Sequence, residues 1–221
     1  MTPRLVIFDV DGTLVDSQTD IIDSMTAAFA GQGMIVPSHE AIKGIVGLSL
    51  PVAVTHLAPR VTEARRDALV AAYKSTYQAL RVQNGAKGSP LFPGARAALE
   101  RLAADPAVTL AIATGKSRRG LDALLVSHDL GGFFASTQVA DDHPSKPHPS
   151  MIHACLRETG VPAERAVIVG DTEFDIEMGH AAGIRAIGVT WGYHPVKRLA
   201  RADLRIDGLD QLDAALGGLW A

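Results

Sequence analysis

The chain alternates between short apolar runs and longer stretches with helical periodicity. Continuous apolar runs of strand length indicate strands buried on both faces, which is typical of parallel sheets. The first three runs each end in a small or polar turn followed by a helical stretch, and this order predicts βαβ units. The predicted strands cover residues 5–8, 109–113, 166–169 and 185–189. We therefore expect an α/β fold with a parallel sheet.

Residues 16–88 differ from the rest of the chain, because helical periodicity dominates there and no clear strand is present. One predicted helix spans residues 62–83 and places on one face Leu69, Tyr73, Tyr77 and Leu80. Residues 84–90 are rich in turn-forming residues, as expected of a hinge between domains. We expect residues 1–15 and 89–221 to form a core domain and residues 16–88 to form an inserted helical domain.

The composition of the chain indicates which classes of molecule it binds. With 21 basic against 24 acidic residues and no long run of one sign, the chain lacks a nucleic-acid footprint and a polybasic membrane patch. Its apolar runs fall far short of the roughly 20 residues that a membrane span needs, and the N-terminus has no secretory signal pattern. The single cysteine, Cys155, is interpreted as a packing residue in a reducing compartment. We therefore expect a cytoplasmic monomer or homodimer whose partner is a small molecule.

Four aspartates stand directly after two of the predicted strands. Asp9 and Asp11 follow the first strand, and Asp171 and Asp175 follow the third. Neighbouring buried carboxylates repel one another unless a cation compensates, and ligands of open α/β sheets bind at the carboxyl ends of strands. These groups can supply the oxygen ligands that Mg²⁺ prefers. The alternative is that Asp11 only begins a tight turn and the other carboxylates are solvated helix starts.

Two further segments carry groups that suit a phosphate. Thr114 and Gly115 offer a hydroxyl and backbone N–H groups at a predicted helix N-terminus. Lys146 lies in a proline-rich loop, where its ammonium can be held over a phosphoryl group. Taken singly, Thr114 is equally a helix cap, and a lone lysine is usually a solvated charge.

These groups, in their order along the chain, resemble the four sequence motifs of the haloacid dehalogenase-like hydrolases. The matching residues are Asp9-Val10-Asp11-Gly12-Thr13, then Thr114, then Lys146-Pro147, then Gly170-Asp171 with Asp175. Four ordered matches over nearly the whole chain are far more specific than one short motif. The helical segment falls where the subfamily with an α-helical cap carries its insertion. The resemblance implies a Rossmann-like parallel sheet with helices on both faces plus an inserted α-helical cap.

The resemblance also implies a reaction, the hydrolysis of a small phosphorylated metabolite. Asp9 is the implied nucleophile, which forms an aspartyl-phosphate that water then hydrolyses. Asp11 is the implied general acid and base. Lys146, Thr114 and backbone N–H groups at Gly115 stabilise the transferring phosphoryl group.

The implied cofactor is Mg²⁺, bound by the aspartates of the first and last motifs. Asp9 and Asp171 are expected to bind through their carboxylates, and Asp11 through its backbone carbonyl. Asp175 is expected to orient metal-bound water more than to bind the ion directly.

Other functions stay open beside the phosphatase. The dehalogenases that resemble this family lack an aspartate at the position of Asp11, which argues against that reaction. An inorganic pyrophosphatase or a β-phosphoglucomutase-like phosphomutase would keep all four motifs. Residues 44–50 offer only Lys43 nearby as a basic partner for a second phosphate, which favours a hydrolase. A non-catalytic phospho-ligand-binding protein would be expected to have lost Asp9 or Lys146, and both are present.

Within the superfamily, the chain is most similar to phosphoglycolate phosphatases and their pyrophosphatase neighbours, through residues 8–17, 170–183 and 190–193. Phosphoglycolate is therefore the leading candidate substrate. The match weakens in the insertion, because residues 45–50 are more apolar than expected for a pocket that binds a small carboxylate, and no arginine of the insertion is an obvious partner for one. Arg118 and Arg119 can reach a substrate anion, although such arginines more often lie on an exposed helix start.

Five more residues invite a functional interpretation and are interpreted as structural. His143, His148 and His153 do not have the spacing of a metal triad. Trp191 and Tyr193, in a segment similar to the family, can equally be core residues.

Overall fold

The computed structural model describes residues 2–220, and its centre is a six-stranded sheet with the strand order β3-β2-β1-β4-β5-β6. All neighbouring strands pair in parallel. The strands are β1 (Arg4–Phe8), β2 (Val108–Thr114), β3 (Phe134–Val139), β4 (Ala166–Gly170), β5 (Arg185–Val189) and β6 (Leu204–Ile206). The predicted α/β fold and its four predicted strands are confirmed.

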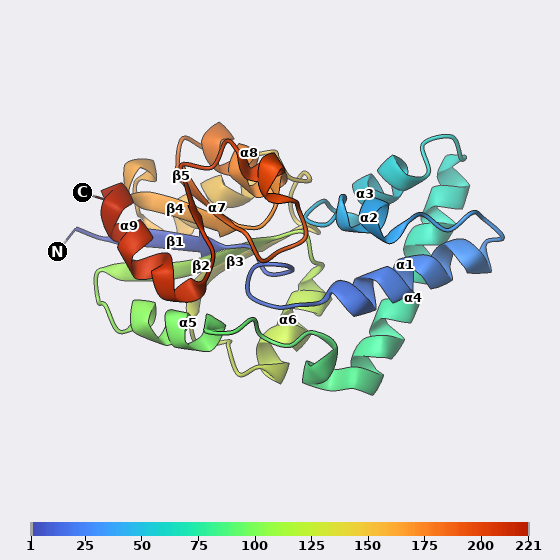
Figure 1. The fold of residues 1–221 in the computed structure, drawn as a ribbon, viewed down its shortest axis with the longest axis horizontal. Helices are drawn as coiled ribbons and strands as arrows, with labels where there is room; N and C mark the ends of the chain where they lie inside the picture. Colours follow the sequence, from blue (N-terminus) through green and yellow to red (C-terminus); the bar gives the residue numbers. More distant parts are fainter. Residues whose placement is uncertain (1, 221) are drawn as a thin grey trace.

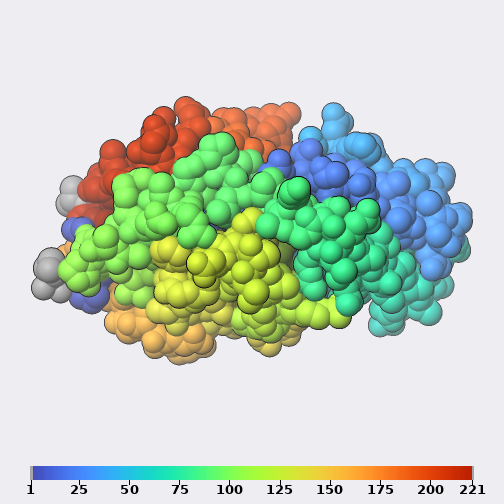
Figure 2. All heavy atoms as spheres, turned by 90° about the horizontal axis from the view of Figure 1, so that it is seen from below, coloured from blue at the N-terminus to red at the C-terminus, as the bar shows by residue number. Residues whose placement is uncertain are grey.

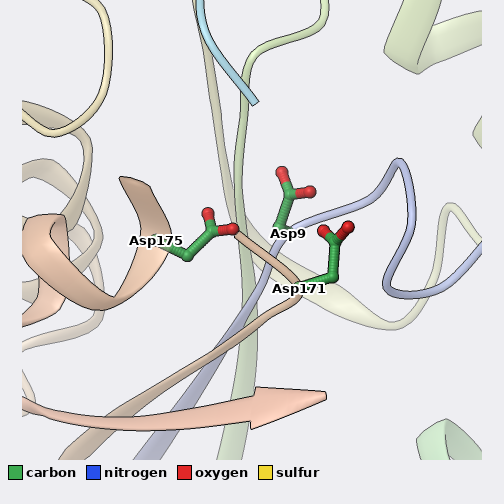
Figure 3. A group of neighbouring side chains, drawn as sticks. All are labelled: Asp9, Asp171 and Asp175. Carbon is green, nitrogen blue, oxygen red and sulfur yellow. The ribbon is translucent and has the colours of Figure 1, made fainter. Parts of the chain in front are cut away.

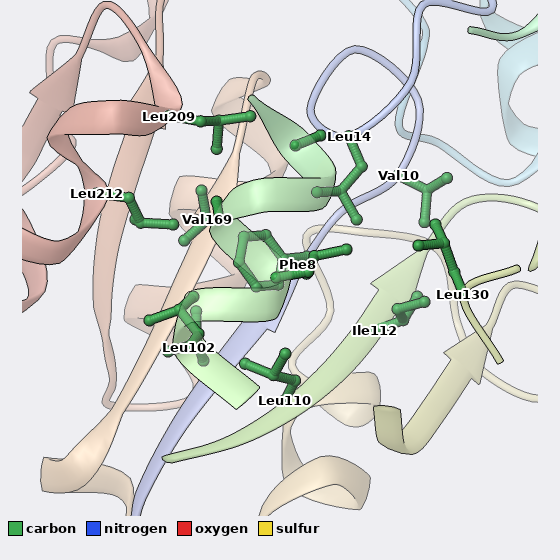
Figure 4. Close-up of a cluster of buried hydrophobic side chains, with 14 of the residues drawn as sticks. Phe8, Val10, Leu14, Leu102, Leu110, Ile112, Leu130, Val169, Leu209 and Leu212 are labelled. Atoms are coloured by element: carbon green, nitrogen blue, oxygen red, sulfur yellow. The ribbon is translucent and has the colours of Figure 1, made fainter. Parts of the chain in front are cut away.

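Helices cover both faces of the sheet (Figure 1). They are α5 (Ala95–Ala103), α6 (Arg118–Ser127), α7 (Ser150–Thr159), α8 (Glu173–Ala181) and α9 (Leu212–Trp220). Alternate residues of β1 point to opposite faces: Val6 and Phe8 join the hydrophobic cluster under α5, α6 and α9, whereas Leu5 and Ile7 join the cluster under α7 and α8. Figure 4 shows the first of these clusters around Phe8. A strand buried on both faces explains the continuous apolar run at the start of the chain.

The segment between β1 and α5 forms a separate group of helices at one end of the molecule (Figures 1 and 2). It consists of α1 (Gln18–Gly31), α2 (His39–Lys43), α3 (Leu50–Leu57), α4 (Glu63–Asn84) and the short 3-10 helix η1 (Gly85–Gly88). These helices share their own hydrophobic cluster, which has Phe29 and Leu69 fully buried within it. The predicted helix over residues 62–83 is confirmed as α4. The division of the chain into domains at residues 16 and 88 stays a prediction, and we call α1 to α4 the cap.

Two strands of the structure, β3 and β6, are not apparent in the apolar pattern. Both lie at the edges of the sheet, and both carry polar or exposed positions, since β3 reads Phe-Ala-Ser-Thr-Gln-Val and β6 has only three residues. Edge strands lack the burial on both faces that produces a continuous apolar run. The remaining short helices are η2 (Ala163–Arg165), η3 (Val196–Leu199) and η4 (Leu209–Gln211).

Cys155 lies on α7 and packs against the sheet. Its side chain is buried, and burial raises the pKa of its thiol to about 12. A thiol held protonated is a poor nucleophile, so the interpretation of Cys155 as a packing residue is confirmed. None of the helices within residues 2–220 is long and apolar enough to cross a membrane.

The cluster under α5 yields a stability prediction. Leu99 is fully buried there and lies outside the strand ends, so Leu99→Ala should lower the free energy of unfolding by about 2–5 kcal/mol. Val126 on α6 is 82% exposed, and Val126→Ala should change the free energy of unfolding by less than about 0.5 kcal/mol. Urea unfolding followed by circular dichroism measures both. Equal effects of the two substitutions would contradict this assignment of the core.

Candidate active site

Three carboxylates meet where β1 and β4 end side by side. Asp9 follows β1, Asp171 follows β4, and Asp175 stands in the first turn of α8. One oxygen from each lies within 4.8 Å of the others, and all three residues are buried. Figure 3 shows the three side chains gathered around one point. The parallel pairing of β1 with β4 thus brings together residues that are more than one hundred and sixty positions apart in the sequence.

Lys146 supplies the one ammonium bonded to this group within residues 2–220. Its Nζ donates to Asp9 Oδ1 at 2.6 Å and to Asp175 Oδ1 at 2.7 Å, and its side chain is fully buried. Burial lowers the pKa of Lys146, but the attraction of Asp175 and Asp9 outweighs it and holds the pKa above its usual value. The lysine is therefore charged at neutral pH. Lys146 lies beside Asp9, but it does not line the pocket that separates the strand ends from the cap.

Asp175 is held by its own helix. Its Oδ2 accepts hydrogen bonds from the Thr172 backbone N–H at 3.1 Å and from Thr172 Oγ1 at 2.6 Å, while the Thr172 hydroxyl caps the N–H of Asp175. This capping box occupies one oxygen, and Lys146 occupies the other. Both oxygens of Asp175 thus have protein partners, and one of these partners is the charged Lys146.

Asp171 is fixed by two segments from opposite ends of the chain. Its Oδ1 accepts from Thr13 Oγ1 at 3.3 Å, and its Oδ2 accepts from the Tyr193 backbone N–H at 2.8 Å. The turn after β1 passes so close that a Cβ atom on Gly12 would lie 2.2 Å from Asp171 Oδ2, and Gly12 has a φ of +85°. Only glycine suits that position, because it has no side chain and adopts positive φ without strain.

Asp9 differs from the other two carboxylates, because its Oδ2 is buried and has no hydrogen-bond partner within residues 2–220. Burial raises the pKa of Asp9 to about 7; Lys146 opposes this shift, and the charge of Asp175 adds to it. Burial also raises the pKa of Asp171, and the charges of Asp9 and Asp175 raise it further.

Three buried carboxylates share one ammonium, which among the described residues bonds only to Asp9 and Asp175, so negative charge is left without compensation. This uncompensated charge and the oxygen-only donor set fit a divalent cation such as Mg²⁺. Asp9 and Asp171 are the residues that would hold it.

Asp11 points to a different set of partners. Its carboxylate oxygens accept from Lys116 Nζ at 2.7 and 2.9 Å, and its Oδ1 also accepts from the Ser17 hydroxyl. Its carboxylate is not among the three that are grouped as a metal site. Burial lowers the pKa of Lys116, but Asp11 and then Tyr77 raise it by more, so the pKa lies above its usual value.

A pocket of about 540 Å³ lies between the strand ends and the cap. Asp9, Asp11, Thr114 and Gly115 form part of its wall, so the predicted catalytic and phosphate-binding groups of the core meet there, Lys146 excepted. Much of the remaining wall is apolar and comes from the cap, including Ile21, Met25, Ile45, Val46, Leu48, Leu50, Tyr73 and Tyr77.

Gly115 is where the cap approaches the core most closely on this wall. A Cβ atom there would lie 2.7 Å from the carbonyl oxygen of Gly47 and 2.9 Å from that of Leu48. The absence of a side chain at this position thus lets the cap backbone rest on the end of β2.

The two arginines that follow β2 behave differently. Arg118 donates to Thr137 Oγ1 at 2.8 Å and to the Thr137 carbonyl at 2.7 Å, which holds it against β3. Arg119 is exposed and lies on the pocket wall.

The other residues singled out in the sequence have structural partners. His143 contacts Gln138 and Ser150, each at 2.8 Å, and the only group with metal-ligand spacing in residues 2–220 is that of the three aspartates. No histidine belongs to that group. Trp191 packs against the main core cluster, whereas Tyr193 contacts the site through its backbone N–H and joins the cap cluster.

Sequence reasoning missed three residues that contact the site carboxylates: Lys116, Ser17 and Thr172. Signals exist for two of them. Lys116 directly follows Thr114 and Gly115, and Thr172 stands three residues before Asp175, which is the spacing of a capping box. No local pattern indicates Ser17.

Comparisons with known proteins agree with this geometry. The family model described as "Haloacid dehalogenase-like hydrolase" matches residues 6–189. A protein of Dickeya dadantii named "Probable phosphatase IndB" is 37% identical over 205 residues, which cover 91% of this chain and 87% of the relative. A phosphoglycolate phosphatase of Pseudomonas savastanoi pv. phaseolicola is 30% identical, over 95% of this chain and 78% of its own length. A haloacid dehalogenase-like hydrolase from Streptococcus pneumoniae has the same fold with a TM-score of 0.82 at 27% identity, covering 96% of this chain and 98% of that one.

The matched range contains all four motif groups, and the fold brings them to one edge of the sheet. Sequence, geometry and relatives agree over most of the chain. The chain belongs to the haloacid dehalogenase-like hydrolase family.

Proposed function

We propose that this chain is a magnesium-dependent phosphatase that hydrolyses a small phosphate monoester through an aspartyl-phosphate on Asp9, with phosphoglycolate as the leading candidate substrate. One observation carries the proposal: Asp9 lines the pocket and keeps a buried carboxylate oxygen that has no partner within residues 2–220. A buried acceptor without a partner is costly, and such exceptions occur at functional sites. The family and the phosphatases among the relatives support the reaction type.

The first half-reaction uses Asp9 as nucleophile. Lys146 holds Asp9 Oδ1 at 2.6 Å, so Oδ2 is the oxygen free to attack phosphorus. A bond forms between Asp9 Oδ2 and phosphorus, and the bond from phosphorus to the ester oxygen breaks. Asp11 donates a proton to that oxygen, and the alcohol leaves.

The second half-reaction reverses the role of Asp11. It removes a proton from a water molecule, the water oxygen bonds to phosphorus, and the bond to Asp9 breaks with release of phosphate. In the structure, Ser17 and Lys116 hold the Asp11 carboxylate in the unprotonated form that can accept this proton.

The phosphoryl group has its own contacts in the proposal. Thr114 is buried at the end of β2, and it lines the pocket together with Gly115. Their hydroxyl and backbone N–H groups bind phosphoryl oxygens as negative charge builds on them. Mg²⁺, when bound by Asp9 and Asp171, neutralises the charge of the carboxylates and of the phosphoryl group.

The setting of the enzyme follows from the same proposal. The substrate is a small phosphorylated metabolite, and the enzyme acts in the cytoplasm as a monomer or homodimer. A panel of substrates tests the proposed phosphatase against three alternatives: a pyrophosphatase, a phosphomutase and a non-catalytic ligand-binding protein.

Asp9→Asn should abolish phosphate release, with a loss of about 10⁴-fold in kcat, because an amide is a poor nucleophile. The measurement is phosphate release from phosphoglycolate, pyrophosphate, sugar phosphates and nucleotides. Mass spectrometry of the acid-quenched wild type should find one added phosphoryl group on the peptide that contains Asp9.

Asp67→Asn is the matched control, because Asp67 is exposed on α4. It should keep full activity. Turnover that survives in Asp9→Asn would exclude the aspartyl-phosphate route. A wild type that converts a sugar phosphate to its isomer without releasing phosphate would identify a mutase.

Metal binding is predicted to depend on Asp171. Mn²⁺ titration followed by electron paramagnetic resonance should show one tight site in the wild type, and Asp171→Asn should weaken it by at least about 10- to 100-fold, the range already typical of losing a residue that only supports a metal ligand. EDTA should abolish phosphate release, and added Mg²⁺ should restore it. Undiminished Mn²⁺ binding by Asp171→Asn would remove Asp171 from the metal site, whereas Asp67→Asn should bind like the wild type.

A further inference from the structure

A second lysine, Lys116, lies on the pocket wall beside the proposed general acid. It is only 9% exposed, and its Nζ donates to both oxygens of Asp11 and to the Tyr77 hydroxyl, the latter at 3.0 Å. Lys116 belongs to the core, whereas Tyr77 belongs to α4 of the cap. Both residues line the pocket. They bring an ammonium and a hydroxyl together where the core meets the cap.

The Tyr77 hydroxyl has a hydrogen to offer. It accepts from Lys116, and it makes no second hydrogen bond within residues 2–220, so its own O–H is free to donate. The ring is held in place by stacking on Tyr73, with ring centroids 5.7 Å apart and planes 17° from parallel. Two donors 3.0 Å apart suit the two oxygens of one carboxylate.

The leaving group of the proposed reaction must lie near this pair. Asp11 has to reach the ester oxygen to protonate it, and Lys116 Nζ is 2.7 Å from Asp11 Oδ1. A carboxylate attached through one carbon to the ester oxygen therefore falls within reach of Lys116 and Tyr77. A longer leaving group would not place its carboxylate at Lys116 and Tyr77 in the same way, and a neutral leaving group has no carboxylate for them to bind.

The pairing of Lys116 with Asp11 does not prevent it from binding a second carboxylate. In the same site, Lys146 donates to two carboxylates at once, those of Asp9 and Asp175. The three N–H groups of Lys116 are engaged by the two Asp11 oxygens and by the Tyr77 hydroxyl, so a substrate carboxylate would take over one of the two N–H groups that now contact Asp11. Lys116 would then bridge Asp11 and the substrate.

Lys116 is also the best-shielded cation on the pocket wall. Lys74 and Arg119 are exposed, and Arg81 is half-buried. Shielding from water strengthens a charge-assisted hydrogen bond. The apolar wall that provides this shielding comes from the cap and includes Ile21, Met25 and Leu50.

We propose that Lys116 and Tyr77 together bind a carboxylate on the leaving group, so that the enzyme selects phosphate monoesters of short hydroxy acids over neutral esters of the same size. This inference rests on the proposed function and assigns its specificity. It also provides a cation where no arginine of the insertion is an obvious partner in the sequence, because Lys116 comes from the core.

The test compares two substrates of nearly equal size, phosphoglycolate and 2-hydroxyethyl phosphate, which differ in the carboxylate. The readout is the ratio of their kcat/KM values. Lys116→Met should lower this ratio by about 10- to 100-fold, the range expected for a hydrogen bond between charged groups. Tyr77→Phe should lower it by about 3- to 10-fold, mainly through the KM for phosphoglycolate.

Tyr73→Phe is the matched control, because the Tyr73 hydroxyl makes no hydrogen bond within residues 2–220 while its ring stacks on Tyr77. It should leave the ratio unchanged. If Lys116→Met lowers kcat/KM equally for both substrates, Lys116 acts only through Asp11 and the inference is wrong. A wild type with no preference for phosphoglycolate would also overturn it. Should Lys116→Met fail to fold, Tyr77→Phe still decides.

A binding measurement separates this inference from the proposed function. Calorimetric titration of Asp9→Asn with either ester in Mg²⁺ reports discrimination without turnover. The combined Asp9→Asn and Lys116→Met protein should lose the preference for phosphoglycolate. If the wild type releases no phosphate but this loss is seen, the hydrolase proposal fails and the carboxylate site stands. Binding that is indifferent to Lys116 would overturn the inference whatever the wild type hydrolyses.

Discussion

The site depends on a single electrostatic constraint, the burial of three carboxylates beside one ammonium. Asp9, Asp171 and Asp175 are grouped where water cannot screen them, and Lys146 bonds two of them. Burial raises the pKa of Asp9 to about 7 even though Lys146 opposes this shift. Such a site favours the binding of a cation, because a cation compensates the remaining negative charge. In our proposal this cation is Mg²⁺, which also neutralises charge on the phosphoryl group.

The parallel sheet makes this arrangement possible, because it brings strand ends from distant parts of the chain to one edge. Close packing at that edge requires residues without side chains: Gly12 beside Asp171, and Gly115 beneath the backbone of Gly47. The cap adds its own contacts across the pocket, such as the hydrogen bond from the Ser49 N–H to Ser145 Oγ at 2.8 Å. Close packing therefore positions Asp171 and the end of β2 at this edge.

The two buried lysines contact different carboxylates and have different roles in our proposals. Lys146 lies between the carboxylates of Asp9, the proposed nucleophile, and Asp175. It donates to Asp9 Oδ1, which leaves Asp9 Oδ2 available for attack on phosphorus in our proposal. Lys116 lies beside Asp11, which protonates the leaving group in our proposal, and it contacts the cap through Tyr77. In our proposals the core carries out the reaction and the junction of core and cap selects the substrate. In the same proposals, a lysine from the core provides the cation for which the sequence of the apolar insertion offers no obvious residue.

The sequence by itself determined the four inner strands, the helix α4, and the carboxylates at the strand ends, because each leaves a local trace in apolar runs, helical periodicity or motif spacing. The edge strands β3 and β6 leave no such trace, since they are half-exposed or very short. Only the tertiary structure decided which cation pairs with which carboxylate. Lys116 meets Asp11 across 105 positions of sequence, and Lys146 meets Asp9 across 137. Such pairings depend on strand order and on how the cap docks, and neither is encoded in any local pattern.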